Sequence, residues 1–97
     1  MDQRLYIVAY DISHPKRWRR IFKLMKGYGE WVQLSVFQCR LTPKQHAELI
    51  ALLDGMIHHT EDHIILMDLG LADNVNPRVV SLGKADFHAI ENEPIIV

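Results

Sequence analysis

Apolar residues form short blocks along the chain, and two of these blocks have the pattern of buried strands. Residues 5–12 are apolar on both alternating faces until Asp11 interrupts them. Residues 62–69 show the same two-sided pattern around an Ile-Ile-Leu-Met core. Because strands buried on both faces lack the polar alternation of half-exposed strands, both blocks are predicted to be central strands of a sheet.

A helical pattern follows the first strand. Ser13 is a suitable cap and Pro15 suits the first turn. Gly27 and Gly29 are predicted to end the helix near Lys26. The apolar positions recur at spacings of three and four residues: Trp18, Ile21, Phe22 and Met25.

The middle of the chain is ambiguous, whereas the helix after it has strong signals. Residues 31–41 are rich in Val, Phe and Trp and fit either one long strand or two short strands with a bend near Leu34 and Ser35. Thr42 and Gln45 then form a capping-box pattern around a proline at the first helical position. Apolar residues continue at helical spacing to Ile57, which predicts a second helix.

If the middle segment is a hairpin, the order of elements is βαββαβ, the α+β ferredoxin-like fold. We predict one such domain over residues 1–97, with a core at about 4–70 and a C-terminal β arm at about 71–97. The arm contains a short strand pattern at 79–82 and an apolar end at 94–97. Both helices of this fold cover one sheet face, so the apolar second face predicts a homodimer in which the arm adds to the partner's sheet edge.

Composition narrows the class of protein. The 97 residues are 48% hydrophobic and 24% charged, which is typical of a folded domain. The chain has one cysteine, Cys39, and its first residues lack the pattern of a signal peptide, so a cytoplasmic protein is expected. The longest apolar runs are far shorter than the roughly 20 residues of a membrane span, so no membrane association is expected.

Asp11 is the strongest candidate for a residue with a chemical role. A carboxylate that interrupts an apolar strand costs free energy if it is buried without a partner. One interpretation is that Asp11 forms the turn into the first helix. The other uses a twofold dimer, in which two copies of Asp11 and bound water would suit Mg²⁺, or Mn²⁺ in its place. Such an ion could activate water for attack on a phosphodiester.

Positive charge is concentrated next to Asp11. Residues 1–45 carry nine Lys or Arg against three Asp or Glu, and residues 46–97 carry two against nine. Six of the basic residues lie in the first predicted helix, and no acidic residue separates them: Lys16, Arg17, Arg19, Arg20, Lys23 and Lys26. They form either a solvated helix face or a surface that binds nucleic-acid phosphates.

Other candidate sites have weaker patterns. His58, His59 and His63 lack a cysteine or a fourth ligand at zinc spacing, so solvent exposure near a helix end is the preferred interpretation. Cys39 is predicted to be a small buried hydrophobic residue. Residues 26–32 resemble the RNP1 signature of RNA-recognition motifs, but they lie before the second strand and not on the third.

The combined motifs resemble the second core CRISPR-associated protein family, the small endonuclease of the adaptation module. The resemblance rests on Tyr10-Asp11-Ile12, the arginine-rich helix ending at residues 27–29, the Val-Gln-Leu-Ser-Val-Phe segment at 32–37 and the Arg-Val-Val-Ser-Leu-Gly segment at 78–83. It covers nearly the whole chain.

This resemblance implies a ferredoxin-like homodimer that joins the CRISPR-associated integrase, captures DNA, and in some members cleaves RNA or double-stranded DNA with Mg²⁺. Asp11 matches the family's metal ligand, shared across the dimer. Tyr10, Arg17, Arg19 and Phe37 match positions linked to activity or nucleic-acid contact, and Ser35 lies at the bend between two short strands. Trp31 replaces a common arginine and Leu34 a common tyrosine.

The leading hypothesis is a metal-dependent endonuclease in which Asp11 holds Mg²⁺ and Arg17, Arg19, Arg20 and Lys23 bind nucleic acid. The alternatives are a non-catalytic DNA-binding scaffold of the integrase complex and a ribonuclease toxin of related fold. The sequence leaves open whether the substrate is RNA or DNA.

Overall fold

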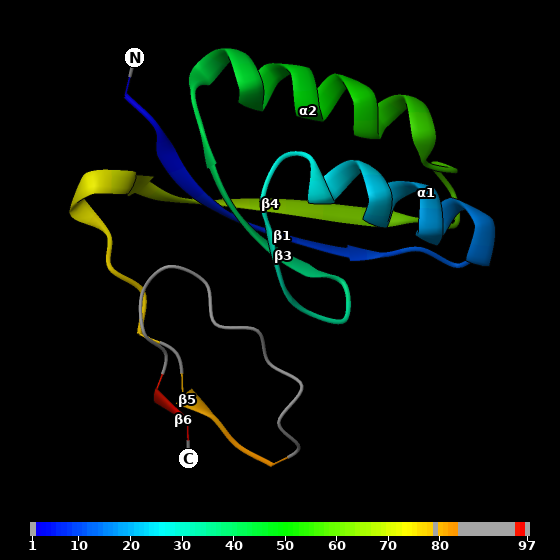
Figure 1. The fold of residues 1–97 in the computed structure, drawn as a ribbon. Coiled ribbons are helices and arrows are strands. Elements are labelled where there is room, and N and C mark those ends of the chain that lie inside the picture. Colours follow the sequence, from blue (N-terminus) through cyan, green and yellow to red (C-terminus); the bar gives the residue numbers. More distant parts are fainter. Residues whose placement is uncertain (1, 79, 84–94, 97) are drawn as a thin grey trace.

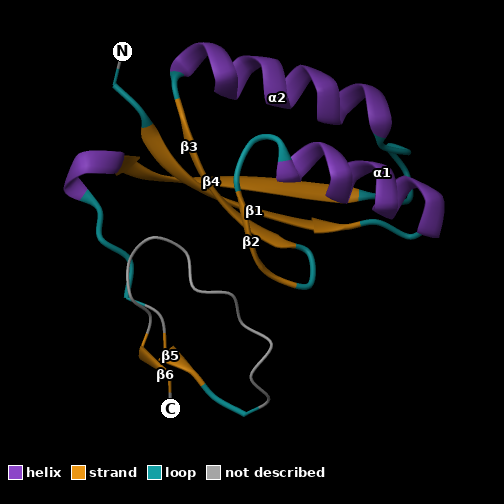
Figure 2. Ribbon diagram, viewed as in Figure 1, coloured by secondary structure: helices purple, strands orange, loops and turns teal. Residues whose placement is uncertain are grey.

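Two helices lie on one face of a four-stranded antiparallel sheet (Figures 1 and 2). The computed structural model describes residues 2–78, 80–83 and 95–96. The elements of the main layer are β1 (Arg4–Asp11), α1 (Pro15–Lys26), β2 (Glu30–Gln33), β3 (Val36–Leu41), α2 (Pro43–Met56) and β4 (His63–Leu71). This βαββαβ order with the strand order β2-β3-β1-β4 confirms the predicted ferredoxin-like fold.

The ambiguous middle segment is two strands. Leu34 has a φ of 41°, in the left-handed region that a bulky residue rarely adopts, and this reverses the chain between β2 and β3. The Tyr10 backbone N–H donates to the Ser35 carbonyl at 3.1 Å, which joins this turn to the end of β1. Ser35 therefore lies at the bend, as predicted.

The position of β4 differs from the prediction. Its two-sided apolar pattern indicated a central strand, but β4 is an edge strand that pairs only with β1 among the described residues. Its outward side chains Ile65, Met67 and Leu69 are each more than 40% exposed. The residues of β4 are apolar on both faces although the helices cover only one of these faces, so the two-sided pattern does not indicate burial within one chain.

The helix starts were predicted with different success. The capping box of α2 is confirmed, with Gln45 N–H donating to Thr42 Oγ1 and Thr42 N–H donating to Gln45 Oε1. The cap of α1 is His14 and not Ser13, because the His14 ring nitrogen accepts a hydrogen bond from the Lys16 backbone. Ser13 instead bonds to the loop before β4.

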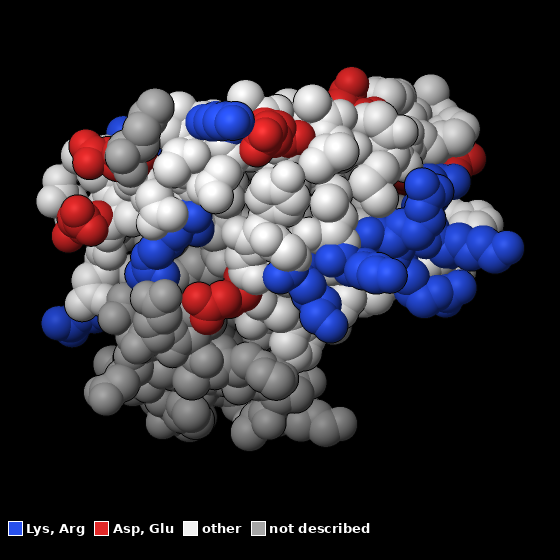
Figure 3. All heavy atoms as spheres, turned by 45° about the horizontal axis from the view of Figure 1, so that its top comes forward, with Lys and Arg blue, Asp and Glu red and all other residues white. Residues whose placement is uncertain are grey.

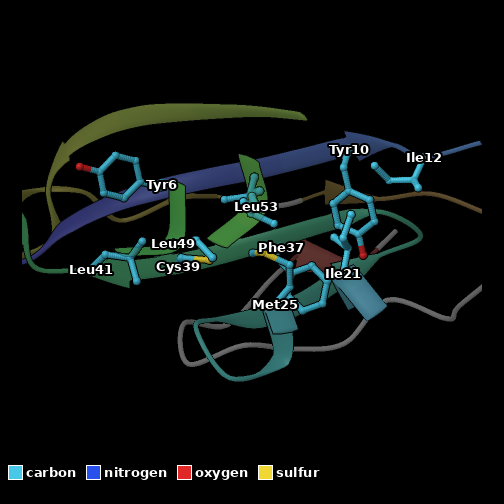
Figure 4. Close-up of a cluster of buried hydrophobic side chains, with 11 residues drawn as sticks. Tyr6, Tyr10, Ile12, Ile21, Met25, Phe37, Cys39, Leu41, Leu49 and Leu53 are labelled. Atoms are coloured by element: carbon cyan, nitrogen blue, oxygen red, sulfur yellow. The ribbon is translucent and has the colours of Figure 1, made fainter. Parts of the chain in front are cut away.

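The core fills the space between the sheet and the helices (Figure 4). Cys39 is buried within it, as predicted. A Cβ atom at Gly29 would overlap the Cys39 sulfur and lie 2.6 Å from the Gln38 carbonyl oxygen, so Gly29 lets the chain pass close to β3 after α1. The central side chains come from four elements: Tyr6, Val8 and Tyr10 from β1, Phe37, Cys39 and Leu41 from β3, Ile21 and Met25 from α1, and Leu49 and Leu53 from α2.

The described part of the C-terminal arm contains a 3-10 turn at Ala72–Asn74, β5 (Val80–Ser81) and β6 (Ile95–Ile96). β5 and β6 pair in parallel as a separate sheet. The strand predicted at 79–82 is thus confirmed at its centre. Residues 79, 84–94 and 97 of the predicted arm lie outside the described residues. No helix in the described ranges is long and apolar enough to cross a lipid bilayer.

Candidate metal centre and nucleic-acid interface

Asp11 is the last residue of β1, and its side chain lies on the uncovered face of the sheet. Tyr10 points into the helix-covered core, and neighbouring strand residues point to opposite faces. Asp11 is exposed, so the burial cost expected from the sequence does not arise. Its carboxylate makes no hydrogen bond or ion pair with any residue that the structure describes, so the turn-forming interpretation finds no support. Both carboxylate oxygens are available to a ligand.

The described residues of one chain do not assemble a metal site. Within the described ranges no group of three or more His, Cys, Asp or Glu side chains could hold an ion. The weak zinc pattern of His58, His59 and His63, which was not the preferred interpretation of the sequence, does not form such a group, and His58 pairs with Thr60 while His59 pairs with Asp54. An exposed carboxylate on an apolar sheet face fits a divalent ion when a second copy brings another carboxylate and water completes the shell.

Most of the basic residues of α1 gather on its outer face (Figure 3). Lys16, Arg19, Arg20 and Lys23 line a shallow depression of about 320 Å³. The first turn contains no acidic residue, and these four side chains form no ion pair within the described chain. Since their charges are not neutralised locally, this surface can attract phosphates. We call these four residues the basic face.

Arg17, also predicted to bind phosphate, lies apart from the basic face. Its Nε donates to Asp62 Oδ2 at 2.8 Å and its Nη2 donates to Glu61 Oε1 at 2.9 Å. These ion pairs join α1 to the loop before β4. The structure therefore gives Arg17 a structural position, since a phosphate would have to compete with two carboxylates for its guanidinium.

Asp62 is the centre of this junction and was missed from the sequence. Its side chain is fully shielded from solvent and also accepts hydrogen bonds from the backbone N–H groups of Ser13 and His58. The hydrogen bond from Arg17 lowers the pKa of Asp62 well below its usual range; burial opposes this shift, and the two backbone donors reinforce it. The connection from Asp11 into α1 is thereby fixed against the start of β4.

Tyr10 and Phe37, predicted as supporting site residues, are core residues. Phe37 is fully buried and packs against Phe22 at a ring distance of 5.5 Å. Burial raises the pKa of Tyr10 to about 12, and its hydroxyl has no hydrogen-bond partner among the described residues. Both rings lie on the opposite side of the sheet from Asp11, so they support the strand end without facing the same ligand.

Ser35, the third predicted supporting residue, ties the β2–β3 turn to α1. The Trp18 indole N–H donates to Ser35 Oγ at 2.8 Å. A second indole N–H, from Trp31, donates to the Leu34 carbonyl at 2.9 Å. Trp31 also meets Phe22 edge to face, so the residue in the place of the family arginine supports the turn.

The part of the chain that forms the main sheet and both helices matches known proteins. The sequence model of the family described as CRISPR associated protein Cas2 matches residues 4–75. A Rhodospirillum rubrum relative named CRISPR-associated endoribonuclease Cas2 1 is 50% identical over 95 residues, covering 98% of this chain and 92% of the relative. A Geobacter sulfurreducens relative named CRISPR-associated endoribonuclease Cas2 is 48% identical over 95 residues, covering 98% of this chain and 99% of the relative. A solved structure described as that of cas2 matches with a TM-score of 0.71 and 29% identity, covering 92% of this chain and 99% of the other.

Proposed function

The chain belongs to the Cas2 family of CRISPR-associated proteins, and from this membership we propose that it is a metal-dependent endonuclease that acts as a homodimer in CRISPR adaptation. The relatives named endoribonucleases support RNA as one substrate. Double-stranded DNA is the second substrate that we propose. The observation that carries the proposal is the exposed Asp11 carboxylate, which has no partner in the described part of the chain and lies on the apolar sheet face that the helices leave uncovered.

The dimer interface is the uncovered face. Ile65, Met67 and Leu69 of β4 expose 42%, 46% and 42% of their surface there. A second copy that covers side chains this exposed stabilises the dimer by about 25 cal/mol per Å² of apolar surface removed from water. In an isologous sheet-to-sheet contact both copies of β1 line the interface, and the two Asp11 side chains meet when the twofold axis passes close to the end of β1.

The two Asp11 carboxylates would hold one Mg²⁺, or Mn²⁺, between the protomers. Such an ion, when bound, would activate a water molecule and stabilise negative charge on the phosphate. Asp11 itself acts as a ligand, because its two oxygens are exposed and have no other partner among the residues that the structure describes. The Asp62–Arg17 junction holds the segment that follows Asp11 and so keeps the carboxylate at a constant position.

The basic face of each protomer binds the nucleic-acid backbone. Its four cations make contacts that are independent of sequence, since phosphates carry no base information. Two such faces in a dimer suit a duplex that spans both protomers, and this binding would let the dimer join the integrase to captured DNA.

A non-catalytic scaffold is the second candidate, and Trp31 favours it. The family arginine at this position would add a phosphate contact, whereas Trp31 uses its indole N–H for the Leu34 carbonyl. The scaffold needs the dimer and the basic face but not the Asp11 metal site.

The test is cleavage of labelled single-stranded RNA and labelled duplex DNA with Mg²⁺, with EDTA and with an Asp11→Ala variant. Glu48→Ala is the matched control, because it removes an exposed carboxylate from α2. We expect the wild type and Glu48→Ala to cleave, and Asp11→Ala and the EDTA sample to be inactive. Cleavage by Asp11→Ala at the wild-type rate would refute the metal mechanism. Binding without cleavage by the wild type would select the scaffold.

A further inference from the structure

His63 lies directly opposite Asp11 in the sheet. The two residues are register partners in the antiparallel ladder between β1 and β4. Their neighbours on the same face are also partners, Ala9 with Ile65 and Ile7 with Met67. Side chains paired in this way have Cβ atoms about 4.5–5.5 Å apart. The imidazole of His63 and the carboxylate of Asp11 therefore leave the same face of the sheet side by side.

Among the five histidines in the described ranges, His63 is the one without a structural contact. It is exposed, and the structure gives it no hydrogen bond, ion pair or ring contact with any described residue. Each of the other four histidines in the described ranges has one: His14 caps α1, His46 stacks on Tyr6 at 4.3 Å, His58 pairs with Thr60 and His59 pairs with Asp54. The packing of the described part of the chain thus gives no reason for a histidine at position 63.

We propose that His63 is a ligand of the same metal ion as Asp11, so that the dimer supplies two carboxylates and two imidazoles. The proposal rests on the dimeric metal site proposed above. It is consistent with the absence of a three-residue metal cluster in the described part of one chain, because each protomer supplies only two of the four ligands.

This ligand set changes the expected metal preference. Mg²⁺ prefers oxygen ligands and keeps several water molecules, whereas imidazole nitrogen suits first-row transition ions. A pair of carboxylates alone discriminates weakly between Mg²⁺ and Mn²⁺. Two added imidazoles favour Mn²⁺, so the site is expected to select Mn²⁺ over Mg²⁺.

The experiment measures metal binding without substrate. Mn²⁺ is titrated into the full-length wild-type protein and into three variants, His63→Ala, Asp11→Ala and His59→Ala, and binding is followed by electron paramagnetic resonance and calorimetry. Mg²⁺ is then used as a competitor. His59→Ala is the matched control, since His59 lies in the loop just before β4 but pairs with Asp54. Pulsed resonance of the bound Mn²⁺ detects nitrogen ligands directly, and circular dichroism checks that each variant is folded.

We expect one Mn²⁺ per two chains and a nitrogen coupling that is present in the wild type and His59→Ala but absent in His63→Ala. His63→Ala should lose at least about tenfold in Mn²⁺ affinity, the loss that follows even from removing a group that only orients a ligand. Its Mg²⁺ affinity should stay within about twofold.

Two outcomes overturn the inference in distinguishable ways. If Mn²⁺ binds and Asp11→Ala abolishes binding, but the wild type shows no nitrogen coupling, His63 is not a ligand and the Asp11 site remains. If Asp11→Ala binds Mn²⁺ as tightly as the wild type, the proposed metal site itself fails, and the role of His63 fails with it.

Discussion

The basic face predicts how strongly nucleic-acid binding depends on salt. Each cation that neutralises a phosphate of duplex DNA contributes about −0.9 to the slope of log K against log salt concentration. The basic face has four cations per protomer, so a dimer has eight and a slope of about −7 if all contact phosphates. Affinity for a short duplex would then fall by about four orders of magnitude between about 50 and 200 mM salt.

The informative perturbation is Arg19→Ala. It removes one cation from each protomer, so the slope should become less negative by about 1.8, and the loss between about 50 and 200 mM salt should fall to about three orders of magnitude. The assay is fluorescence anisotropy of a labelled duplex across this salt range, with EDTA present so that no cleavage occurs.

Two controls make the result specific. Lys44→Ala removes the same charge from the start of α2 and should leave the slope unchanged. Arg17→Ala removes a guanidinium already neutralised by Asp62 and Glu61, so it should lower the melting temperature with little effect on the slope. An unchanged slope for Arg19→Ala, or an equal change for Lys44→Ala, would refute the assignment of this surface.

The remaining predictions concern stability and reactivity. Gly29→Ala should lower the free energy of unfolding by about 1–3 kcal/mol, since its methyl group would overlap β3, whereas Gly55→Ala, with open space around it in α2, should raise this free energy by about 0.5–1 kcal/mol; urea denaturation measures both. Burial raises the pKa of the Cys39 thiol to about 12, so a thiol reagent at neutral pH should modify it only after denaturant is added, and rapid modification of the native protein would contradict its burial. Because the folded state lowers the pKa of Asp62, this carboxylate stabilises the fold above its ordinary value of 3.8 and loses this effect as pH falls through the lowered value. Asp62→Asn should therefore melt below the wild type at pH 7, and the difference should shrink below about pH 4; a constant difference would show that ionisation is not the cause.

Local signals in the sequence were sufficient to predict most of the fold. Thr42 and Gln45 predicted the start of α2 because a capping box involves only residues three apart. The local apolar pattern of residues 62–69 could not place β4 at the sheet edge, because strand order depends on pairing between residues more than 50 positions apart. The shift of the α1 cap from Ser13 to His14 has the same cause, since Ser13 is held by the distant residues Glu61 and Asp62.

The candidate site also contains one residue that the sequence alone could predict and others whose roles depend on tertiary contacts. Asp11 was predicted because a carboxylate in an apolar run is visible in the sequence itself. Arg17 and Arg19 are equivalent in the sequence, and only the tertiary contact with Asp62 separates a structural arginine from a member of the basic face. The pairing of His63 with Asp11 depends on the β1–β4 register, so the sequence offered only its place in a weak zinc pattern.

The positions of Asp11 and the basic face bear on whether this protein cleaves what it binds. Asp11 lies on the uncovered face of the sheet, whereas the basic face lies on the outer side of a helix that covers the opposite face. A phosphate held by the middle of α1 is therefore separated from Asp11 by the thickness of the helix and the sheet. Cleavage requires a strand that passes around the end of the sheet at the β1–α1 connection, whereas bridging requires only the basic faces. Binding and cleavage should consequently separate: Asp11→Ala should keep the wild-type salt slope in the anisotropy assay while losing any cleavage. A change in the slope of Asp11→Ala as large as that of Arg19→Ala would show that the bound nucleic acid already reaches the carboxylate.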